Sequence, residues 1–230
     1  MTGWTEYTLA LVAFTASHFV PRIGDLRGRL IGLVGRRAYF SVYGLLSLAL
    51  LVWVIVAAGR APFVEVWPQA PWTRWAPNLL MPLAAVLIVN GIGIAQPFTL
   101  GGKRQAVFDP TDPGFAAISR HPLFLALALW SLAHLVPNGD LAHVILFGLF
   151  AALALAAIPI FDARAQAQLG PHTAPAFFRA TGPFSLVPLA NRSWRKRNGG
   201  RLVKRTAIGI ILWAALLLGH TAVIGVSPLP

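Results

Sequence analysis

Charged residues are scarce in this sequence. Asp, Glu, Lys and Arg make up only 11% of its 230 residues, whereas hydrophobic residues make up 57%. Soluble domains carry about 25% charged residues, because a surface in contact with water must be covered with polar groups. So low a charge content excludes an ordinary soluble domain and directs attention to the apolar segments.

Cysteine is absent altogether. The chain therefore has no disulfide framework, no thiolate metal site and no thiolate ligand for a haem iron. The HExxH pattern of zinc hydrolases and an HxxxH spacing are also missing. Histidine is the residue type left to bind a metal or a haem at membrane depth.

Six long apolar stretches are present, each near the length that a helix needs to cross a bilayer core of roughly 30 Å. None carries Asp, Glu, Lys or Arg in its interior, so each can lie in lipid without an unpaired charge. We expect an all-α, polytopic transmembrane helical bundle of about six spans. The first stretch lacks the basic start of a secretion signal, so we expect it to be retained as a helix. The predicted spans are residues 6–20, 38–58, 76–97, 121–136, 141–161 and 206–226.

The net charge of +12 is distributed unevenly along the chain. All but two of the 19 Lys and Arg residues lie in alternate connections, after the first, third and fifth stretches. Cytoplasmic loops of membrane proteins retain Lys and Arg, so we predict that both termini lie outside the cytoplasm. This orientation requires an even number of spans and makes the lipid bilayer, not nucleic acid, the partner of the basic residues.

The spans form one predicted domain, residues 1–230. Residues 98–120 contain Gly101, Gly102, Pro110 and Pro113, which predict a cytoplasmic loop. Residues 162–205 predict a second cytoplasmic loop, part of which could lie on the inner leaflet as an interfacial helix. No internal repeat and no carboxylate inside a span are found, so a transporter has the least support.

Five of the six histidines lie in or at the ends of the predicted spans. The predicted topology, at about 1.5 Å per helical residue, places them at two levels of the membrane. His18 and His121 belong to the cytoplasmic level, and His134, His143 and His220 to the outer level. Facing imidazoles in a helical bundle can hold a haem iron.

Asp140 lies three residues before His143, in a turn with Asn138 and Gly139. This position suits a residue that caps the N-terminus of the fifth span. A carboxylate here could also orient the His143 ring, as carboxylates do for histidines that bind metals.

Several segments together resemble the NnrU family of bacterial membrane proteins, which is related to 15-cis-zeta-carotene isomerase. The most specific of them are Arg120-His121-Pro122 and residues 129–141, which contain His134 and the Asn-Gly-Asp turn. Ser17-His18, the basic residues 25–30 and the end of the chain from His220 also match. The resemblance covers nearly the whole sequence.

The resemblance implies a multi-pass protein of the bacterial inner membrane that is connected with nitrite and nitric oxide reduction in denitrification. It also implies haem b with His18 and His134 as axial ligands. The predicted topology separates these two residues by about 15 Å along the membrane normal, which conflicts with one shared iron. His134 with His220 is the alternative pair, and His121 is a further candidate.

Three functions follow as hypotheses. The chain is a haem protein of denitrification, a haem-dependent cis-trans isomerase of a carotenoid or other polyene, or a non-catalytic accessory or assembly factor. An accessory factor would act on components of a nitric oxide or nitrite reductase. Loss of function on replacing His18 or His134 would separate the haem hypotheses from the accessory one.

Overall fold

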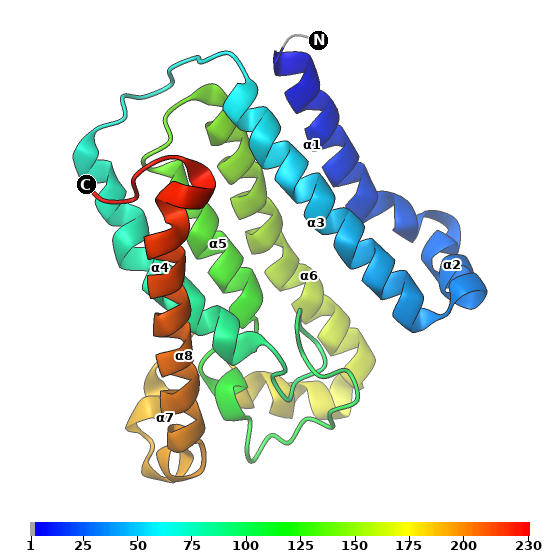
Figure 1. Ribbon diagram of the computed structural model, residues 1–230. Helices are drawn as coiled ribbons and strands as arrows, with labels where there is room; N and C mark the ends of the chain where they lie inside the picture. The colour runs from blue at the N-terminus through cyan, green and yellow to red at the C-terminus, as the bar shows by residue number, and fades with distance from the viewer. Residues whose placement is uncertain (1–2) are drawn as a thin grey trace. The chain divides into compact units, whose positions relative to one another are not determined.

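The computed structural model describes residues 3–230 and consists of helices joined by loops (Figure 1). No strand occurs in this range. Glu65 and Asp140 form an isolated antiparallel β-bridge. The prediction of an all-α fold is therefore confirmed. The helices are α1 (Gly3–Phe19), η1 (Val20–Asp25), α2 (Leu26–Val34), α3 (Arg36–Arg60), η2 (Pro71–Arg74), α4 (Trp75–Gly91), η3 (Gly114–Ala117), α5 (Pro122–Leu135), α6 (Leu141–Ala180), α7 (Val187–Ala190) and α8 (Arg192–Ile224).

Four helical segments in the described range are long and apolar enough to cross a membrane: Arg36–Arg60, Pro71–Gly91, Leu141–Ala180 and Arg192–Ile224. They coincide with the second, third, fifth and sixth predicted spans. The first and fourth predicted spans coincide with α1 and α5, which are shorter, at 17 and 14 residues. The membrane character of the chain is thus supported, whereas six spans with both termini outside remain a prediction.

Two helices extend well beyond the predicted spans. Helix α6 runs past Phe161 because the next residues, Asp-Ala-Arg-Ala-Gln-Ala-Gln-Leu, are mostly good helix formers. Its regular path is interrupted at Gly170, where φ is 71°. Helix α8 begins at Arg192, where the Asn191 side chain caps the backbone N–H of Trp194. Helices therefore occupy much of residues 162–205.

The chain divides into two compact units, which we describe separately. The first unit comprises the residues up to Pro68 together with Asn138–Leu146. Within it α1 packs against α3. Tyr7, only 1% exposed, donates a 2.7 Å hydrogen bond from its hydroxyl to the carbonyl of Ala142. The start of α6 is tied to α1 by this bond.

The second unit comprises Gln69–Pro137 and Phe147–Pro230, and within it α4 packs against both α5 and α8 (Figure 1). Glycines allow both close approaches. A methyl group added at Gly91 would lie 2.8 Å from Cγ of Pro122, and one at Gly209 would lie 2.8 Å from Cα of Val86. Small residues at helix crossings serve this purpose in membrane bundles, where packing replaces the hydrophobic effect.

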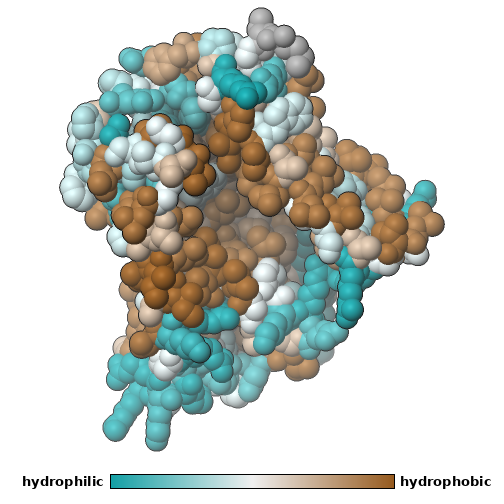
Figure 2. Space-filling model, in the orientation of Figure 1, coloured by the Kyte–Doolittle hydropathy of each residue, from teal (hydrophilic) through white to brown (hydrophobic). Residues whose placement is uncertain are grey.

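Large apolar side chains are exposed along the helices of both units, and Figure 2 shows extensive hydrophobic surface. On α3, Leu45 is 69% exposed, and on α8, Leu218 and Val223 are 85% and 81% exposed. Such exposure is unfavourable in water and suits helices that are surrounded by lipid chains.

The predicted topology can be tested with single cysteines, because the natural chain has none. Gln69 precedes α4 and Ser193 begins α8, and both are exposed. In intact cells, a membrane-impermeant maleimide is expected to label Gln69→Cys, and Ser193→Cys only after the membrane is disrupted. Equally rapid labelling of both positions in intact cells would contradict the predicted orientation.

Candidate functional site

His18, in α1, is held with its Nδ1 atom turned toward the helix backbone. Nδ1 lies 2.8 Å from the carbonyl oxygen of Phe14. A carbonyl only accepts hydrogen bonds, so Nδ1 carries the proton and Nε2 carries the lone pair. The ring packs on Phe14, with centroids 4.6 Å apart, and the Ser47 hydroxyl lies 3.5 Å from Nε2.

His134 has the same arrangement near the end of α5. Its Nδ1 lies 2.8 Å from the carbonyl oxygen of Trp130, which again assigns the lone pair to Nε2. The ring packs against Trp130 and Phe147, each with a centroid 5.5 Å away. The imidazole is therefore oriented by its own helix within an aromatic environment from α5 and α6.

His220, in α8, is the third histidine of this kind. Its Nδ1 lies 2.8 Å from the carbonyl oxygen of Val226. His220 is close enough to His134 for the two imidazoles to interact electrostatically. Of the histidines singled out as haem ligands, His134 and His220 thus lie near each other in the second unit, while His18 belongs to the first unit.

Asp140 and His143 contact each other in the first unit. The Asp140 carboxylate accepts a hydrogen bond from the backbone N–H of His143 at 3.2 Å, which caps the start of α6. Both carboxylate oxygens also lie 2.8 Å from Nδ1 of His143. One side chain therefore caps the helix and orients the ring.

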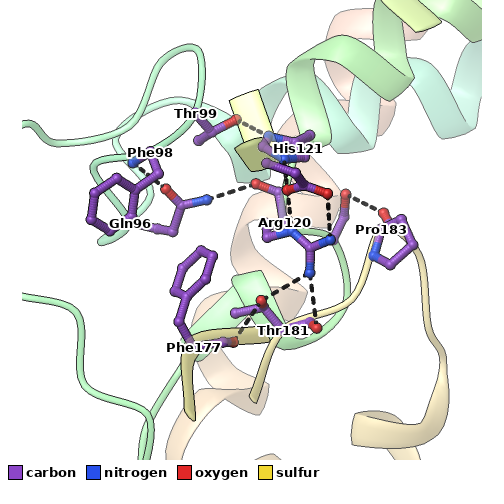
Figure 3. A network of polar contacts seen from close by, with 10 residues as sticks. Gln96, Phe98, Thr99, Arg120, His121, Phe177, Thr181 and Pro183 are labelled. Carbon is purple, nitrogen blue, oxygen red and sulfur yellow. Dashed lines mark hydrogen bonds and ion pairs between the residues drawn. The ribbon is translucent and has the colours of Figure 1, made fainter. Parts of the chain in front are cut away.

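His121 lies in a different environment, a buried group of polar side chains that we call the Arg120 network (Figure 3). Its Nε2 lies 2.8 Å from Oδ1 of Asp162, and its Nδ1 lies 2.9 Å from the hydroxyl of Thr99. Both ring nitrogens are engaged, so in this arrangement neither is available to a metal. The network consists of Gln96, Thr99, Ser119, Arg120, His121, Asp162 and Thr181.

Arg120 is the centre of the network and is only 6% exposed. Its Nε and Nη2 groups donate to the two carboxylate oxygens of Asp162 at 2.7 and 2.8 Å. Its Nη1 group donates to the carbonyl and the hydroxyl of Thr181, both at 3.1 Å. This bidentate contact with Asp162 is the strong form of an arginine–carboxylate ion pair.

The loop before α5 and the segment after α6 are both hydrogen-bonded to the Arg120 network. Gln96 donates from its side-chain amide to the carbonyl of Arg120 at 2.8 Å, and its own carbonyl accepts from the backbone of Phe98. Ser119 donates to the carbonyl of Pro183 at 3.0 Å. The network therefore joins residues 96–99, the start of α5, α6 and the segment after α6.

The Arg120 network is closed. No buried side-chain nitrogen or oxygen in the described range lacks a hydrogen-bond partner. The same range contains no group of three or more His, Asp or Glu side chains that could hold a metal ion. Its hydrogen bonds join the start of α5 to α6 and to the segment after α6.

Sequence reasoning singled out Arg120 and His121 but missed their partner Asp162. Asp162 was assigned to the beginning of a loop because it follows the last apolar residue of a predicted span. A signal was nevertheless present, since Asp162 is the only acidic residue after Asp140 in a strongly basic part of the chain. An isolated carboxylate beside lipid requires a cationic partner.

The donor chemistry of the histidines can be compared with that of a haem site. Histidines that bind a metal usually donate their second ring nitrogen to a carbonyl or carboxylate, which fixes the tautomer. His18, His134 and His220 each bond Nδ1 to a backbone carbonyl in this way, which places the lone pair on Nε2. Their chemistry therefore fits residues that would hold a haem iron, whereas both ring nitrogens of His121 are hydrogen-bonded within the Arg120 network.

Comparison with known protein families finds a match over nearly the whole chain. The family described as NnrU protein matches residues 6–228 of the chain. Comparison with curated proteins and with solved structures finds no match.

Proposed function

Because the chain belongs to the NnrU family, we propose that it is a haem b protein of the bacterial inner membrane that supports nitrite and nitric oxide reduction. His18 and His134 would hold the haem iron, with His220 as the alternative second ligand. The observation that carries this proposal is the common orientation of the three rings, each with Nδ1 bonded to a carbonyl. A haem held in this way would supply one-electron exchange.

The aromatic surroundings of the histidines support the same proposal. A haem needs a wide apolar pocket, and His134 lies against Trp130 and Phe147. His18 lies against Phe14 and near Tyr43, whose ring centroid is 6.0 Å away. The Ser47 hydroxyl beside Nε2 of His18 would have to turn away to admit a metal.

The role in denitrification is testable by complementation. A nitrite- and nitric-oxide-reducing bacterium that lacks this gene is expected to regain nitric oxide consumption with the wild type and with His172→Ala. His172 is exposed and serves as the matched control. His134→Ala is expected to leave consumption at the level of the deletion strain, because the haem would be lost. Full restoration by His134→Ala would contradict a haem-dependent role.

A non-catalytic accessory or assembly factor is the second candidate function. The closed Arg120 network favours it, because a fully hydrogen-bonded group fixes helices without offering a reactive side chain. An accessory factor without haem would restore nitric oxide consumption equally well with or without His134. A polyene isomerase would also use the histidines, and conversion of an added cis-polyene by the purified protein would identify that activity.

A further inference from the structure

The end of α4 and the beginning of the apolar half of α8 form a cationic surface. Arg205 donates from Nη1 to the carbonyls of Val89, Asn90 and Ile92, at 2.9, 3.1 and 2.9 Å. These carbonyls end α4 and carry the negative end of the helix dipole. In the described range, the Nε and Nη2 donors of Arg205 have no hydrogen-bond partner in the protein.

Two lysines flank this arginine. Lys204 is its neighbour in α8 and is exposed. Lys103 is exposed as well. Its backbone N–H donates to the carbonyl of Ile94 at 2.9 Å, which holds Lys103 close to the residues that follow α4. A methyl group added at Gly93 would lie 3.8 Å from Cε of Lys103. Arg205 and Lys103 therefore lie beside the residues that follow α4, and Lys204 adds a third cation next to Arg205 in α8.

No acidic side chain belongs to the segments that build this surface. Asp and Glu are absent from residues 66–108 and from residues 163–230. By contrast, the more distant Arg197 pairs with Asp112 at 3.3 Å. These segments thus balance the positive charge of Arg205 only through the carbonyls at the end of α4, and the two lysines add charge that suits an anionic ligand.

The position of the surface along α8 identifies the ligand. Thr206 begins the long apolar half of α8, so Arg205 and Lys204 lie where a spanning helix leaves the hydrocarbon. Lipid phosphates occupy this level, and basic residues here attract anionic headgroups. Ile208 and Ile211, 45% and 68% exposed, lie on the hydrocarbon side of Arg205 along α8 and provide apolar surface next to the cations. Figure 2 shows the hydrophobic surface giving way to hydrophilic surface toward the α7 end of α8.

We propose that Arg205, Lys204 and Lys103 form a binding site for the phosphate of an anionic phospholipid. The Nε and Nη2 donors of Arg205 hold the phosphate, the lysines add charge, and the acyl chains lie along Ile208 and Ile211. The lipid thereby bridges α4, the residues that follow it and α8. This site is independent of any haem.

The test measures the unfolding temperature of the full chain in detergent during titration with phosphatidylglycerol or phosphatidylcholine. Phosphatidylglycerol is expected to raise the unfolding temperature of the wild type, and phosphatidylcholine is not. The double variant Lys103→Gln/Lys204→Gln is expected to bind phosphatidylglycerol about 25-fold more weakly, since each basic residue near a headgroup contributes roughly fivefold. Both lysines are exposed, so the variant is expected to fold.

The matched control is Arg192→Gln/Lys196→Gln, which removes the same charge from exposed positions of the same helix. It lies about 12 Å or more from Lys204 along α8 and is expected to bind the lipid as the wild type does. Equal loss in both double variants would overturn the site in favour of diffuse charge attraction. Absence of a phosphatidylglycerol effect on the wild type, or equal stabilisation by soluble glycerol phosphate, would overturn it as well.

Discussion

Replacing Asp162 with alanine is expected to lower the free energy of unfolding by about 3–5 kcal/mol, because it leaves a buried cation without a partner. The Arg120 side chain is only 7% exposed and the Asp162 side chain 24%, so little water can replace the lost carboxylate. His121 loses the acceptor for Nε2 in the same step. Tryptophan fluorescence during unfolding of the detergent-solubilised protein provides the measurement.

Arg197 offers the control for this substitution. It pairs with Asp112 at 3.3 Å, and both side chains are nearly half exposed, at 48% and 44%. Exposed pairs contribute at most about 1 kcal/mol, so Arg197→Ala, which keeps the bond between Asp112 and buried Asn198, is expected to change stability little. A similar small loss for Asp162→Ala would show that the Arg120 network does not stabilise the fold.

A double variant separates the charge pair from its surroundings. Arg120→Met/Asp162→Leu removes both charges and fills the space with apolar side chains of similar size. Such replacements are often neutral or stabilising, so the double variant is expected to be more stable than Asp162→Ala alone. If it is instead less stable than that single variant, the hydrogen bonds of Arg120 to Thr181 outweigh the cost of the unpaired charge.

Replacing His134 with alanine is expected to abolish the Soret absorbance of the purified protein. The expectation rests on the proposed haem and on the tautomer of His134. Its Nδ1 donates to the Trp130 carbonyl, so the lone pair is on Nε2. Expression with an added haem precursor ensures that the cofactor is not limiting. Absorption spectra of the oxidised and reduced protein provide the measurement.

Four further substitutions identify which histidines hold the haem. His121→Ala and His172→Ala are expected to retain the haem, because both ring nitrogens of His121 are hydrogen-bonded and His172 is exposed. His18→Ala is expected to change a low-spin spectrum to a high-spin one, while His220→Ala is not. The opposite result for this last pair would assign the second ligand to His220. A normal spectrum for His134→Ala would contradict the proposed ligand.

The helices could largely be predicted from the sequence, because lipid-crossing segments must be long, apolar and free of unpaired charge. The six predicted stretches coincide with helices for this reason. Their ends were harder to predict. Helix α6 continues through Asp162, whose carboxylate meets Arg120 across 42 positions of sequence, a contact that no local pattern reveals.

The histidines illustrate the same limit at the candidate site. Their number and position near span ends pointed to a cofactor, and His121 was grouped with His18 by depth. Hydrogen bonds distinguish them, since His121 donates to a carboxylate while His18 donates to the carbonyl of its own helix. Ring orientation depends on side-chain rotamers and on distant neighbours, so sequence spacing alone could not separate a network residue from a ligand.

The haem content of the purified wild-type protein tests the proposed function most directly. The chain is expressed with an added haem precursor, purified in mild detergent, and assayed for haem b by its pyridine complex. We expect haem b in equimolar amount with the chain, and its loss in His134→Ala but not in His172→Ala. A wild-type protein that is folded, as judged by cooperative unfolding, and yet contains no haem would contradict the proposal.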